Sequence, residues 1–291
     1  MKIKKLDKEQ VGRIKLQSFF GFSKLPFTKY IWSSKMFQAQ SQQEMIEGLH
    51  YSLEVRGISL VIGSPGVGKS ITLRKFKDEL SPQSYQPFYL WNTRISPVGF
   101  LRSLCRTFQL PLRPYIADMF DSVNVYLGSL EDTIGKYPIL LFDECDNLSR
   151  EVLEHLRLLM NYQMDSEEKF SLIMCGTEKL QNLLREHAHT AFRQRITYCH
   201  KLRPFTFDDA RAYVQYHLSR VDGAPEIFTD GAVNLLFQMS RGLPRVMNQV
   251  AIQSLIHAAI HRVERIDENL IRRNVDINLL IELPDEEKTL L

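Results

Sequence analysis

The segment Ile58-Ser-Leu-Val-Ile-Gly-Ser-Pro-Gly-Val-Gly-Lys-Ser70 predicts the fold of this chain. Its second part, Gly63–Ser70, has the P-loop pattern of a glycine, four further residues and then Gly-Lys-Ser. A P-loop binds phosphate when it follows a strand and precedes a helix, and the sequence predicts both elements. The apolar run Ile58–Ile62 ends at the loop, and helical residues follow from Ile71 to Leu80. The combination predicts an α/β domain that binds a nucleotide.

The residues of this loop have separate predicted roles. Small residues let backbone N–H groups wrap around phosphates, and the positive end of the following helix adds to the attraction. Lys69 is predicted to reach the β- and γ-phosphates and to be a catalytic residue, and the Ser70 hydroxyl is predicted to bind Mg²⁺. ATP and Mg²⁺ are therefore the expected cofactors. The nucleotide-binding residues predicted in this segment are Gly63, Ser64, Pro65, Gly66, Val67, Gly68, Lys69, Ser70 and Ile71.

A second apolar run, Ile139–Phe142, ends in the acidic pair Asp143 and Glu144. If this strand lies beside the P-loop strand, Asp143 can hold hydrated Mg²⁺, and Glu144 can orient and polarise the attacking water. An apolar strand that ends in two acidic residues is common, so this pattern alone is weak evidence for a catalytic site. It becomes strong evidence because it follows a P-loop. Together the two segments predict ATP hydrolysis, with Asp143 as a metal ligand and Glu144 as a catalytic residue.

The rest of the sequence predicts two regions. Strand candidates Phe88–Trp91 and Phe170–Met174 alternate with helical segments Pro97–Phe108 and Arg150–Met160, which is typical of a parallel sheet covered by helices on both faces. From Pro204 onward only helices are predicted. We therefore expect an α/β core followed by a small all-helical lid. The lid helices are predicted at Asp208–Arg220, Asp230–Ser240, Pro244–His261 and Asp267–Asn274. The expected regions are an aromatic-rich N-terminal extension (1–40), the core (41–203), the lid (204–275) and a C-terminal tail (276–291).

Length, charge and composition limit the possible classes of protein. The 291 residues and 44% hydrophobic content suffice for a sizeable core. The net charge of +3 permits a nucleic-acid partner without requiring one. The four cysteines are isolated, which argues against a disulfide framework or a zinc knuckle. No window holds the roughly 20 apolar residues that cross a bilayer, so we expect no membrane partner and a cytoplasmic location.

Phosphoryl transfer depends on positive groups that stabilise the developing charge, so further cationic residues are expected. The candidates are Arg193 and Arg195, within Phe192–Ile196, and Arg245, which ends a Gly-Leu-Pro-Arg segment. Their spacing is also compatible with a solvated helix face. The sequence pattern leaves both interpretations open.

Taken together, these residues resemble the AAA+ ATPase superfamily, which implies a P-loop NTPase core with a helical lid. The resemblance makes Gly63–Ser70 the Walker A motif and Phe142–Glu144 the Walker B motif. It also implies catalytic roles for a sensor 1 residue, for an arginine finger that acts on a neighbouring subunit's nucleotide, and for a sensor 2 residue. In that order, these roles fall on Thr177, on Arg193 or Arg195, and on Arg245. As the sensor 2 residue, Arg245 would also reach from the lid and contact the bound nucleotide.

Within that superfamily the sequence is similar to the ExeA-like group, through Phe19–Phe22, Pro26-Phe27, Phe192–Ile196, Gly242–Arg245 and Asn248-Gln249. Its P-loop departs from the group's usual Gly-Lys-Thr-Thr by ending in Gly-Lys-Ser-Ile. The group contains secretion ATPases, which carry further membrane and cell-wall-binding parts. It also contains transposition helper ATPases of the TniB, TnsC and MuB type, and the short chain beyond the lid favours this second branch.

The resemblance to transposition helpers implies a set of partners. ATP-bound subunits would form a ring or helical filament on double-stranded DNA, present a target site to a transposase, and disassemble on hydrolysis. A target-selector protein is a further partner that this branch allows. Two alternatives stay open, a secretion-associated ATPase and a nucleotide-gated switch ATPase that does not bind DNA.

Arg94, Arg102 and Arg106 are the predicted contacts to DNA phosphates, because related filaments use that side of the core. A solvated basic surface is the alternative interpretation. The sequence contains no helix-turn-helix or zinc-finger pattern, so the expected DNA binding is not sequence-specific.

Overall fold

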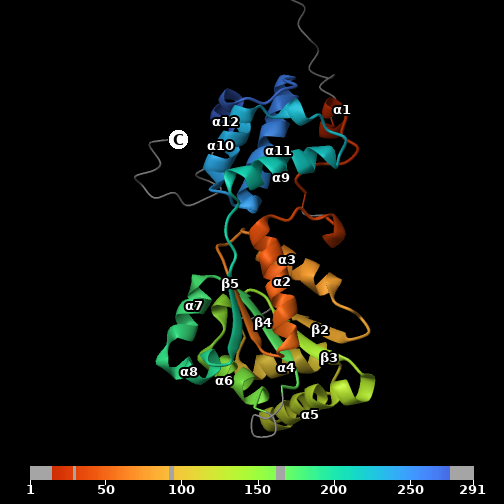
Figure 1. Cartoon of the computed structure of the whole chain (residues 1–291), viewed down its shortest axis with the longest axis vertical. Coiled ribbons are helices and arrows are strands. Elements are labelled where there is room, and N and C mark those ends of the chain that lie inside the picture. Colours follow the sequence, from red (N-terminus) through yellow and green to blue (C-terminus); the bar gives the residue numbers. More distant parts are fainter. Residues whose placement is uncertain (1–14, 29–30, 92–94, 162–167, 276–291) are drawn as a thin grey trace, which may run out of the picture. The chain divides into compact units, whose positions relative to one another are not determined.

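The computed structural model describes residues 15–28, 31–91, 95–161 and 168–275. Contacts between residues divide this part of the chain into two compact units (Figure 1). The larger unit is Gln38–Arg203, and the smaller one holds the described residues before Gln38 and after Arg203. The strands of the larger unit are β1 (Ile58–Ile62), β2 (Tyr85–Leu90), β3 (Tyr137–Phe142), β4 (Ser171–Gly176) and β5 (Ile196–Lys201). Its α-helices are α2 (Gln40–Glu54), α3 (Lys69–Glu79), α4 (Pro97–Thr107), α5 (Ile116–Ile134), α6 (Arg150–Leu159), α7 (Glu178–Arg185) and α8 (Thr190–Arg193).

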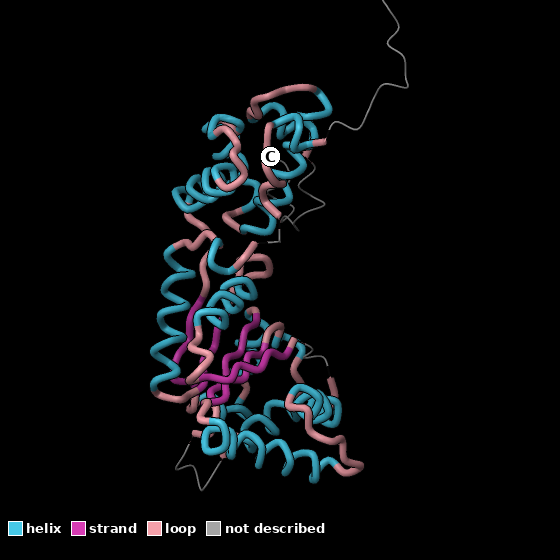
Figure 2. Tube along the Cα trace, turned by 90° about the vertical axis from the view of Figure 1, so that its right-hand side faces the viewer, coloured by secondary structure: helices cyan, strands magenta, loops and turns pink. Residues whose placement is uncertain are grey.

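The strands, drawn in magenta in Figure 2, form one parallel sheet. Their order in the sheet is β2-β3-β4-β1-β5. Every residue of β1, β3 and β4 is buried. Their aliphatic and β-branched runs suit the centre of a sheet, because apolar side chains on both faces find buried partners there. The predicted parallel α/β sheet is confirmed, and the carboxyl ends of β3, β4 and β1 are neighbours.

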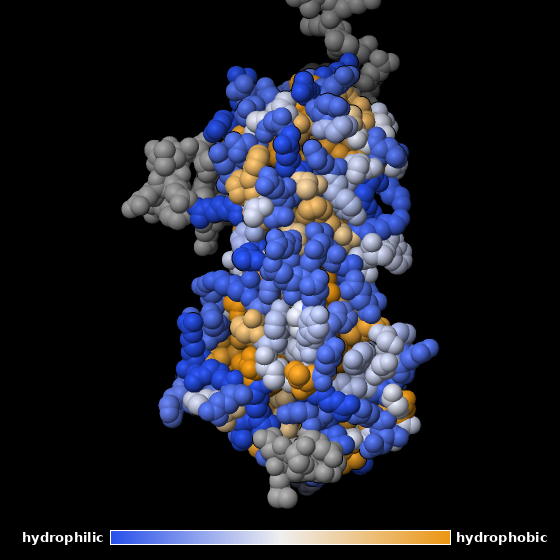
Figure 3. Space-filling model, viewed as in Figure 1, coloured by the Kyte–Doolittle hydropathy of each residue, from blue (hydrophilic) through white to orange (hydrophobic). Residues whose placement is uncertain are grey.

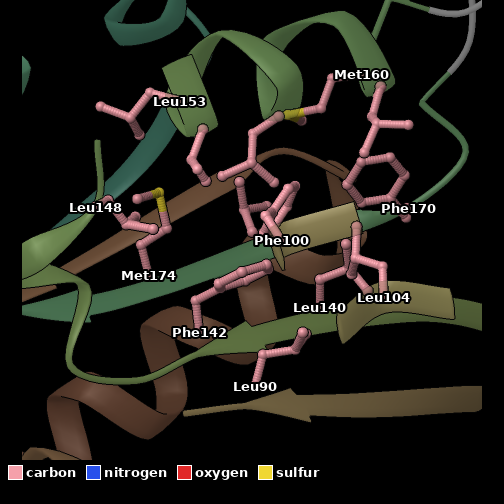
Figure 4. Packing of buried hydrophobic residues seen from close by; sticks show 14 of the residues in the cluster. Leu90, Phe100, Leu104, Leu140, Phe142, Leu148, Leu153, Met160, Phe170 and Met174 are labelled. Atoms are coloured by element: carbon pink, nitrogen blue, oxygen red, sulfur yellow. The ribbon is translucent and has the colours of Figure 1, made fainter. Parts of the chain in front are cut away.

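One large hydrophobic cluster packs on one face of this sheet, with side chains from helices α4 to α8. Phe142 of β3 lies against Phe100 of α4, with ring centroids 5.9 Å apart (Figure 4). Leu153 of α6 and Met174 of β4 belong to the same cluster, and all four side chains are at most 1% exposed. Burying one such side chain contributes roughly 1.5–3 kcal/mol. The cluster therefore holds β3 and β4 firmly side by side.

The remaining side chains of β1 point to the opposite face, toward α2. Alternate residues of a strand face opposite sides of its sheet, and Ser59 of β1 hydrogen-bonds to Ser52 of α2. Helix α2 buries Met45, Leu49 and Leu53 at four-residue steps, as an amphipathic helix does. It also packs against α3 and β5. Helix α3, which follows the P-loop, is thus supported from its side.

The smaller unit is helical. Two of the predicted lid helices, Asp230–Ser240 and Pro244–His261, are confirmed with the predicted bounds. The Thr229 side chain caps the first by accepting the N–H of Ala232, and the second begins with a proline, which favours a first helical position. The α-helices of this unit are α1 (Leu16–Phe20), α9 (Phe207–Ser219), α10 (Asp230–Ser240), α11 (Pro244–His261) and α12 (Glu268–Asn274).

The described residues before Gln38 pack into this helical unit through their aromatic rings. Phe27 stacks on His217 of α9, with ring centroids 5.0 Å apart. Phe37 lies 5.5 Å from the ring of Tyr213 on the same helix. Phe27, Tyr213 and His217 are all buried. The aromatic segment that the sequence sets apart as an extension therefore supplies core side chains to the helical unit.

His217 is expected to make the helical unit less stable in mild acid. Its ring is 3% exposed, and its Nδ1 atom accepts a hydrogen bond from the N–H of Phe27 at 3.2 Å. Burial, with a smaller contribution from Arg220, lowers the pKa of His217 from 6.5 to about 4. In the unfolded chain this histidine has the ordinary pKa of 6.5. Between pH 6.5 and about 4, the unfolded chain therefore binds more protons at this residue than the folded chain does. Stability is therefore complete above the unfolded pKa and falls as the pH falls toward the folded one.

Lowering the pH from about 7.5 to about 5 should cost about 2 kcal/mol of unfolding free energy through this group. Denaturant unfolding of the wild type and of His217→Gln at both pH values measures the effect, because glutamine does not titrate. The difference in unfolding free energy between the wild type and the variant should shrink as the pH falls. A difference in stability that stays constant with pH would contradict the prediction.

The described part of the chain contains no helix that is both long and apolar enough to cross a bilayer. The face seen in Figure 3 is mostly hydrophilic, with hydrophobic residues in small separate patches. Large apolar side chains that are exposed include Trp32 (80%) and Tyr115 (72%). Scattered exposure of this kind is ordinary for a protein surface.

Candidate nucleotide site

The P-loop turns tightly between β1 and α3, and its glycines make this possible. Gly68 has a φ of +111° and would place a Cβ atom 2.9 Å from Nε2 of Gln42. Gly66 also has a positive φ, of 81°. The N–H of Gly63 donates to the carbonyl of Gly176 at 3.1 Å, which ties the start of the loop to the end of β4. Only glycine combines such backbone angles with this close approach, so a side chain at position 68 would distort the loop.

Lys69 begins α3, and its ammonium group lies against the loop. The Nζ atom donates to the carbonyl of Gly63 at 2.7 Å and to that of Ser64 at 3.2 Å. Ser70 follows in the first turn of the helix and is exposed. The arrangement places a positive charge where the N–H groups at the start of α3 attract phosphate. The predicted nucleotide-binding residues Gly63–Ile71 all lie in this loop and first turn.

Asp143 directly follows β3 and is 3% exposed. Its carboxylate oxygens have different partners: Oδ1 accepts the N–H of Glu144 at 2.9 Å, and Oδ2 accepts the hydroxyl of Tyr89 at 3.2 Å. Burial and, to a smaller extent, the charge of Asp143 raise the pKa of Tyr89 well above its usual value. The hydroxyl therefore stays protonated and donates its hydrogen bond to Asp143. Tyr89 lies on the neighbouring strand β2. The sequence alone does not point to it, because tyrosine is an ordinary strand residue.

Glu144 is exposed, although Asp143 beside it is buried. Its backbone has φ 56° and ψ 41°, in the left-handed region that residues other than glycine rarely adopt. Holding a residue in this conformation costs about 1–3 kcal/mol, and such strain concentrates at functional sites. The turn gives the two adjacent carboxylates different surroundings. The pair thus suits the predicted division between a metal ligand and a group that acts on water.

Thr177 follows β4 and caps α7. Its N–H and its hydroxyl both donate to Oδ1 of Asp146, at 2.6 Å and 2.8 Å. Its hydroxyl oxygen accepts the N–H of Lys179 at 3.3 Å. Asp146 lies in the short 3-10 helix η2 (Cys145–Asn147), which follows the acidic pair. Asp146 is not among the predicted site residues, although a further carboxylate three residues after Asp143 is a signal that could have found it.

These groups meet at one edge of the sheet because their strands are neighbours. The register aligns Ile62, the last residue of β1, with Gly176 of β4, and β3 pairs with β4 on its other side. Ligands of parallel sheets bind at this carboxyl edge. The donor set of glycine-lined loop, ammonium group, hydroxyl and buried carboxylate fits a nucleotide with Mg²⁺. Ser70 and Asp143 would hold the ion, which when bound would neutralise charge on the β- and γ-phosphates.

Arg193 and Arg195 both hydrogen-bond within their own chain. Nη1 of Arg193 donates to the carbonyl of Leu184 at 2.9 Å, near the end of α7. Nη1 of Arg195 donates to the carbonyl of Met160, which ends α6, at 3.2 Å. Both side chains are half-buried. Each arginine thus satisfies a carbonyl that a helix end leaves without an intrahelical partner.

The other predicted arginines have exposed side chains or lie outside the described residues. Arg245 is exposed in the first turn of α11, in the helical unit. Arg102 and Arg106 are exposed four residues apart on α4, and so share one helix face. Arg94 lies outside the described residues. The roles of these four arginines stay predictions.

Comparison with known proteins supports the sequence resemblance. Residues 53–184 match a family model described as AAA domain. General secretion pathway protein A of Aeromonas hydrophila is 31% identical over 246 residues, which make up 82% of this chain. The match covers 44% of that protein, so the chain spans less than half of its length. These findings support an AAA+ ATPase of the ExeA-like type.

Solved structures with a similar fold include Cdc6p from Pyrobaculum aerophilum, with a TM-score of 0.68, 16% identity, and coverage of 90% of this chain and 74% of that chain. Drosophila ORC bound to DNA has a TM-score of 0.67 and 14% identity, covering 99% of this chain and 71% of that chain. The Thermotoga maritima RuvB Holliday junction branch migration motor has a TM-score of 0.55 and 16% identity, and the match covers 86% of this chain and 71% of that chain. At these identities the likeness shows the fold, and the predicted AAA+ P-loop NTPase fold is confirmed.

Proposed function

We propose that this chain, which has the AAA+ P-loop NTPase fold, is an ATP-dependent, DNA-binding oligomeric regulator of DNA transposition in the cytoplasm. ATP-bound subunits assemble as a ring or filament on double-stranded DNA. The assembly presents target DNA to a transposase, with a target-selector protein as a further partner, and hydrolysis drives disassembly. The observation that carries DNA binding is the exposed pair Arg102 and Arg106 on α4. The choice of transposition rests on the resemblance of the sequence to transposition helpers.

The basic pair suits DNA that is bound without sequence preference. Leu101 and Leu104 are buried against the core, while Arg102 and Arg106 are exposed on the same helix. Guanidinium groups in this position can bind backbone phosphates without reading bases. Two structures with a similar fold, Drosophila ORC and Aeropyrum pernix ORC1, are bound to DNA. They support DNA as a ligand that this fold can hold.

Control of assembly by the nucleotide is proposed to act through side chains that change partner. Lys69 binds loop carbonyls, while Arg193 and Arg195 bind carbonyls near the ends of α7 and α6. Phosphate oxygens are stronger acceptors for these cations than neutral carbonyls. A bound nucleotide would therefore attract Lys69, and a neighbouring subunit's nucleotide would attract one of the arginines. This exchange would couple ATP binding to contacts between subunits.

A second candidate is a secretion-associated ATPase. The 31% identity to general secretion pathway protein A favours it. ATP would then change the assembly or conformation of the chain without any help from DNA. A nucleotide-gated switch without a DNA partner leads to the same expectation. Dependence on DNA therefore separates the proposed function from both alternatives.

An assembly experiment tests the proposal. The chain is mixed with duplex DNA and ATP, a non-hydrolysable analogue, ADP or no nucleotide, and its size is measured by sedimentation and negative-stain electron microscopy. We expect rings or filaments that need both DNA and a triphosphate and that persist longer with the analogue. Failure to form DNA-dependent oligomers with either triphosphate would reject DNA-bound assembly. Oligomers that form with ATP and ignore DNA would favour the second candidate.

The transposition part of the proposal has its own test. A transposase encoded in the same organism should bind the DNA-bound assembly and should stimulate its ATP hydrolysis. Pull-down of the transposase on DNA coated with the chain measures the first effect, and phosphate release measures the second. DNA-bound assembly without either effect would keep the DNA-binding ATPase and reject its role in transposition.

Replacing both Arg102 and Arg106 by Ala is expected to weaken DNA binding in a salt-dependent way. Each phosphate contact releases counterions and contributes about 0.9 to the slope of log affinity against log salt concentration. The double variant should therefore reduce the magnitude of this slope by about 2, with similar losses on unrelated sequences. Fluorescence anisotropy with short duplexes over a range of salt concentrations measures it.

Arg185→Ala is the matched control for this pair. Arg185 is also an exposed arginine of the larger unit, at the end of α7. It should keep the wild-type slope. An equal change in the control and the double variant would mean that only net charge matters, and an unchanged slope in the double variant would reject α4 as the DNA-binding helix.

A further inference from the structure

One carboxylate oxygen joins two loops at the nucleotide site. Oδ1 of Asp146 accepts the N–H of Thr177 at 2.6 Å and the hydroxyl of the same residue at 2.8 Å. Asp146 belongs to the loop after β3, which also carries Asp143 and Glu144, and Thr177 directly follows β4. Hydrogen bonds to a charged acceptor are roughly twice as strong as neutral ones. The two bonds therefore hold the acidic loop and the loop of Thr177 together.

The close approach of these loops depends on Gly176, the last residue of β4. A Cβ atom on Gly176 would lie 3.1 Å from Oδ1 of Asp146 and 2.7 Å from a side-chain carbon of Leu180. The side chain of Asp146 is half-buried. Such a site is less solvated than the surface, and hydrogen bonds in it are stronger than in water. The contact between Asp146 and Thr177 is thus built into the end of the strand.

These contacts determine how the Thr177 hydroxyl can act. A threonine hydroxyl has one proton to donate and two lone pairs that accept. Because a carboxylate oxygen only accepts, the proton points to Asp146, and one lone pair accepts the N–H of Lys179. One lone pair is left. In this arrangement Thr177 can accept a hydrogen bond from water but cannot donate one to a phosphate oxygen.

We propose that Asp146 is a positioning residue for ATP hydrolysis, which holds Thr177 so that its remaining lone pair is offered to the attacking water. Thr177 and Glu144 would then each accept one of the two protons of that water. As the water oxygen bonds to the γ-phosphorus and the bond to the ADP oxygen breaks, one proton passes to Glu144 and the other stays hydrogen-bonded to Thr177. Holding the water in line in this way is a main source of rate in phosphoryl transfer. The inference concerns hydrolysis and does not depend on DNA binding or transposition.

Two substitutions of Asp146 test this. Alanine removes both hydrogen bonds, whereas asparagine keeps an oxygen that can accept them. We expect Asp146→Ala to lower the single-turnover rate of ATP hydrolysis roughly 10- to 100-fold, with the affinity for a fluorescent ATP analogue changed by less than about twofold. Asp146→Asn should restore most of the rate. The melting temperature of each variant shows whether it is folded.

A mutant cycle with Thr177→Val tests whether Asp146 acts through Thr177. If it does, the variant that combines Asp146→Ala with Thr177→Val should be no slower than the slower of the two single variants. Asn147→Ala is the control, because Asn147 is the exposed neighbour of Asp146, and it should hydrolyse ATP at the wild-type rate.

Several results would overturn the proposal. A wild-type rate in Asp146→Ala would show that the contact is not used in hydrolysis. Equal losses with alanine and asparagine would mean that the charge of Asp146 matters and the direction of the hydroxyl does not. Rate losses that multiply in the combined variant would mean that the two residues act independently. A loss of nucleotide affinity as large as the loss of rate would give Asp146 a purely structural role.

Discussion

Replacing Glu144 by Gln should leave ATP bound and almost unhydrolysed. Glutamine preserves the size of the side chain but cannot take a proton from the attacking water. Loss of a positioned general base typically lowers a rate by about 100-fold or more, and we expect at least that effect on turnover. Nucleotide affinity should stay unchanged, because Glu144 lies after β3 and outside the P-loop. Phosphate release and titration with a fluorescent nucleotide measure the two quantities.

Glu151→Gln is the matched control for this prediction. Glu151 is an exposed glutamate in the first turn of α6, in the same unit, and its replacement should leave turnover unchanged. Near-normal turnover in Glu144→Gln would mean that Glu144 does not position the water. If ATP-bound subunits assemble on DNA, the oligomer of Glu144→Gln should also last longer than that of the wild type.

Replacing Lys69 by Ala should strongly weaken nucleotide binding, and with it hydrolysis and assembly. The ammonium group lies against the P-loop, bonded to the carbonyls of Gly63 and Ser64 at 2.7 Å and 3.2 Å. Removing one partner of a desolvated charge pair costs about 2–5 kcal/mol. Since 1.4 kcal/mol corresponds to a tenfold change, the Kd for ATP should rise by a factor between about 30 and several thousand. Isothermal titration with ATP and Mg²⁺ measures it.

Lys77→Ala is the control for Lys69→Ala. Lys77 lies in the last turn of the same helix, with its Nζ atom 3.7 Å from Asp78, and its loss should leave ATP affinity unchanged. Wild-type affinity in Lys69→Ala would reject the P-loop assignment. Compared with Glu144→Gln, the Lys69 variant should have the opposite effect on assembly, because it prevents the ATP-bound state that the other variant preserves.

Short-range patterns suffice to predict the strand, loop and helix that carry the nucleotide site. Strand β1 has the predicted bounds Ile58–Ile62, since a continuous apolar run needs burial on both faces. The edge strand β5 (Ile196–Lys201) is not predicted, because its residues alternate between half-buried and exposed and none is fully buried. Helix α5 (Ile116–Ile134) is not predicted either. Apolar residues such as Val125, which is 69% exposed, lie outside the buried face of this helix. They weaken the 3.6-residue repeat of apolar positions by which an amphipathic helix is predicted.

The nucleotide-binding residues are predictable because a P-loop works through local backbone geometry. The groups that hold the catalytic residues are not predictable in this way. Tyr89 and Asp146 are separated from their partners by 54 and 31 residues, and they meet them only when β2, β3 and β4 lie side by side. Likewise, the sequence shows Arg193 and Arg195 as two cations, and only the folded chain shows them bound to carbonyls near the ends of helices.

Three features are predictable from the amino-acid sequence alone: the nucleotide loop, the acidic pair after β3, and the change from an α/β core to a helical region. These features depend on contacts between residues a few positions apart, so their patterns are visible in a single chain. Tertiary structure decided that Asp146 turns the hydroxyl of Thr177. It also decided that Phe27 and Phe37, which the sequence assigns to a separate extension, pack on the rings of α9. These contacts join residues that are far apart in the sequence. They are not visible in local sequence patterns, because the residues meet only when the chain folds.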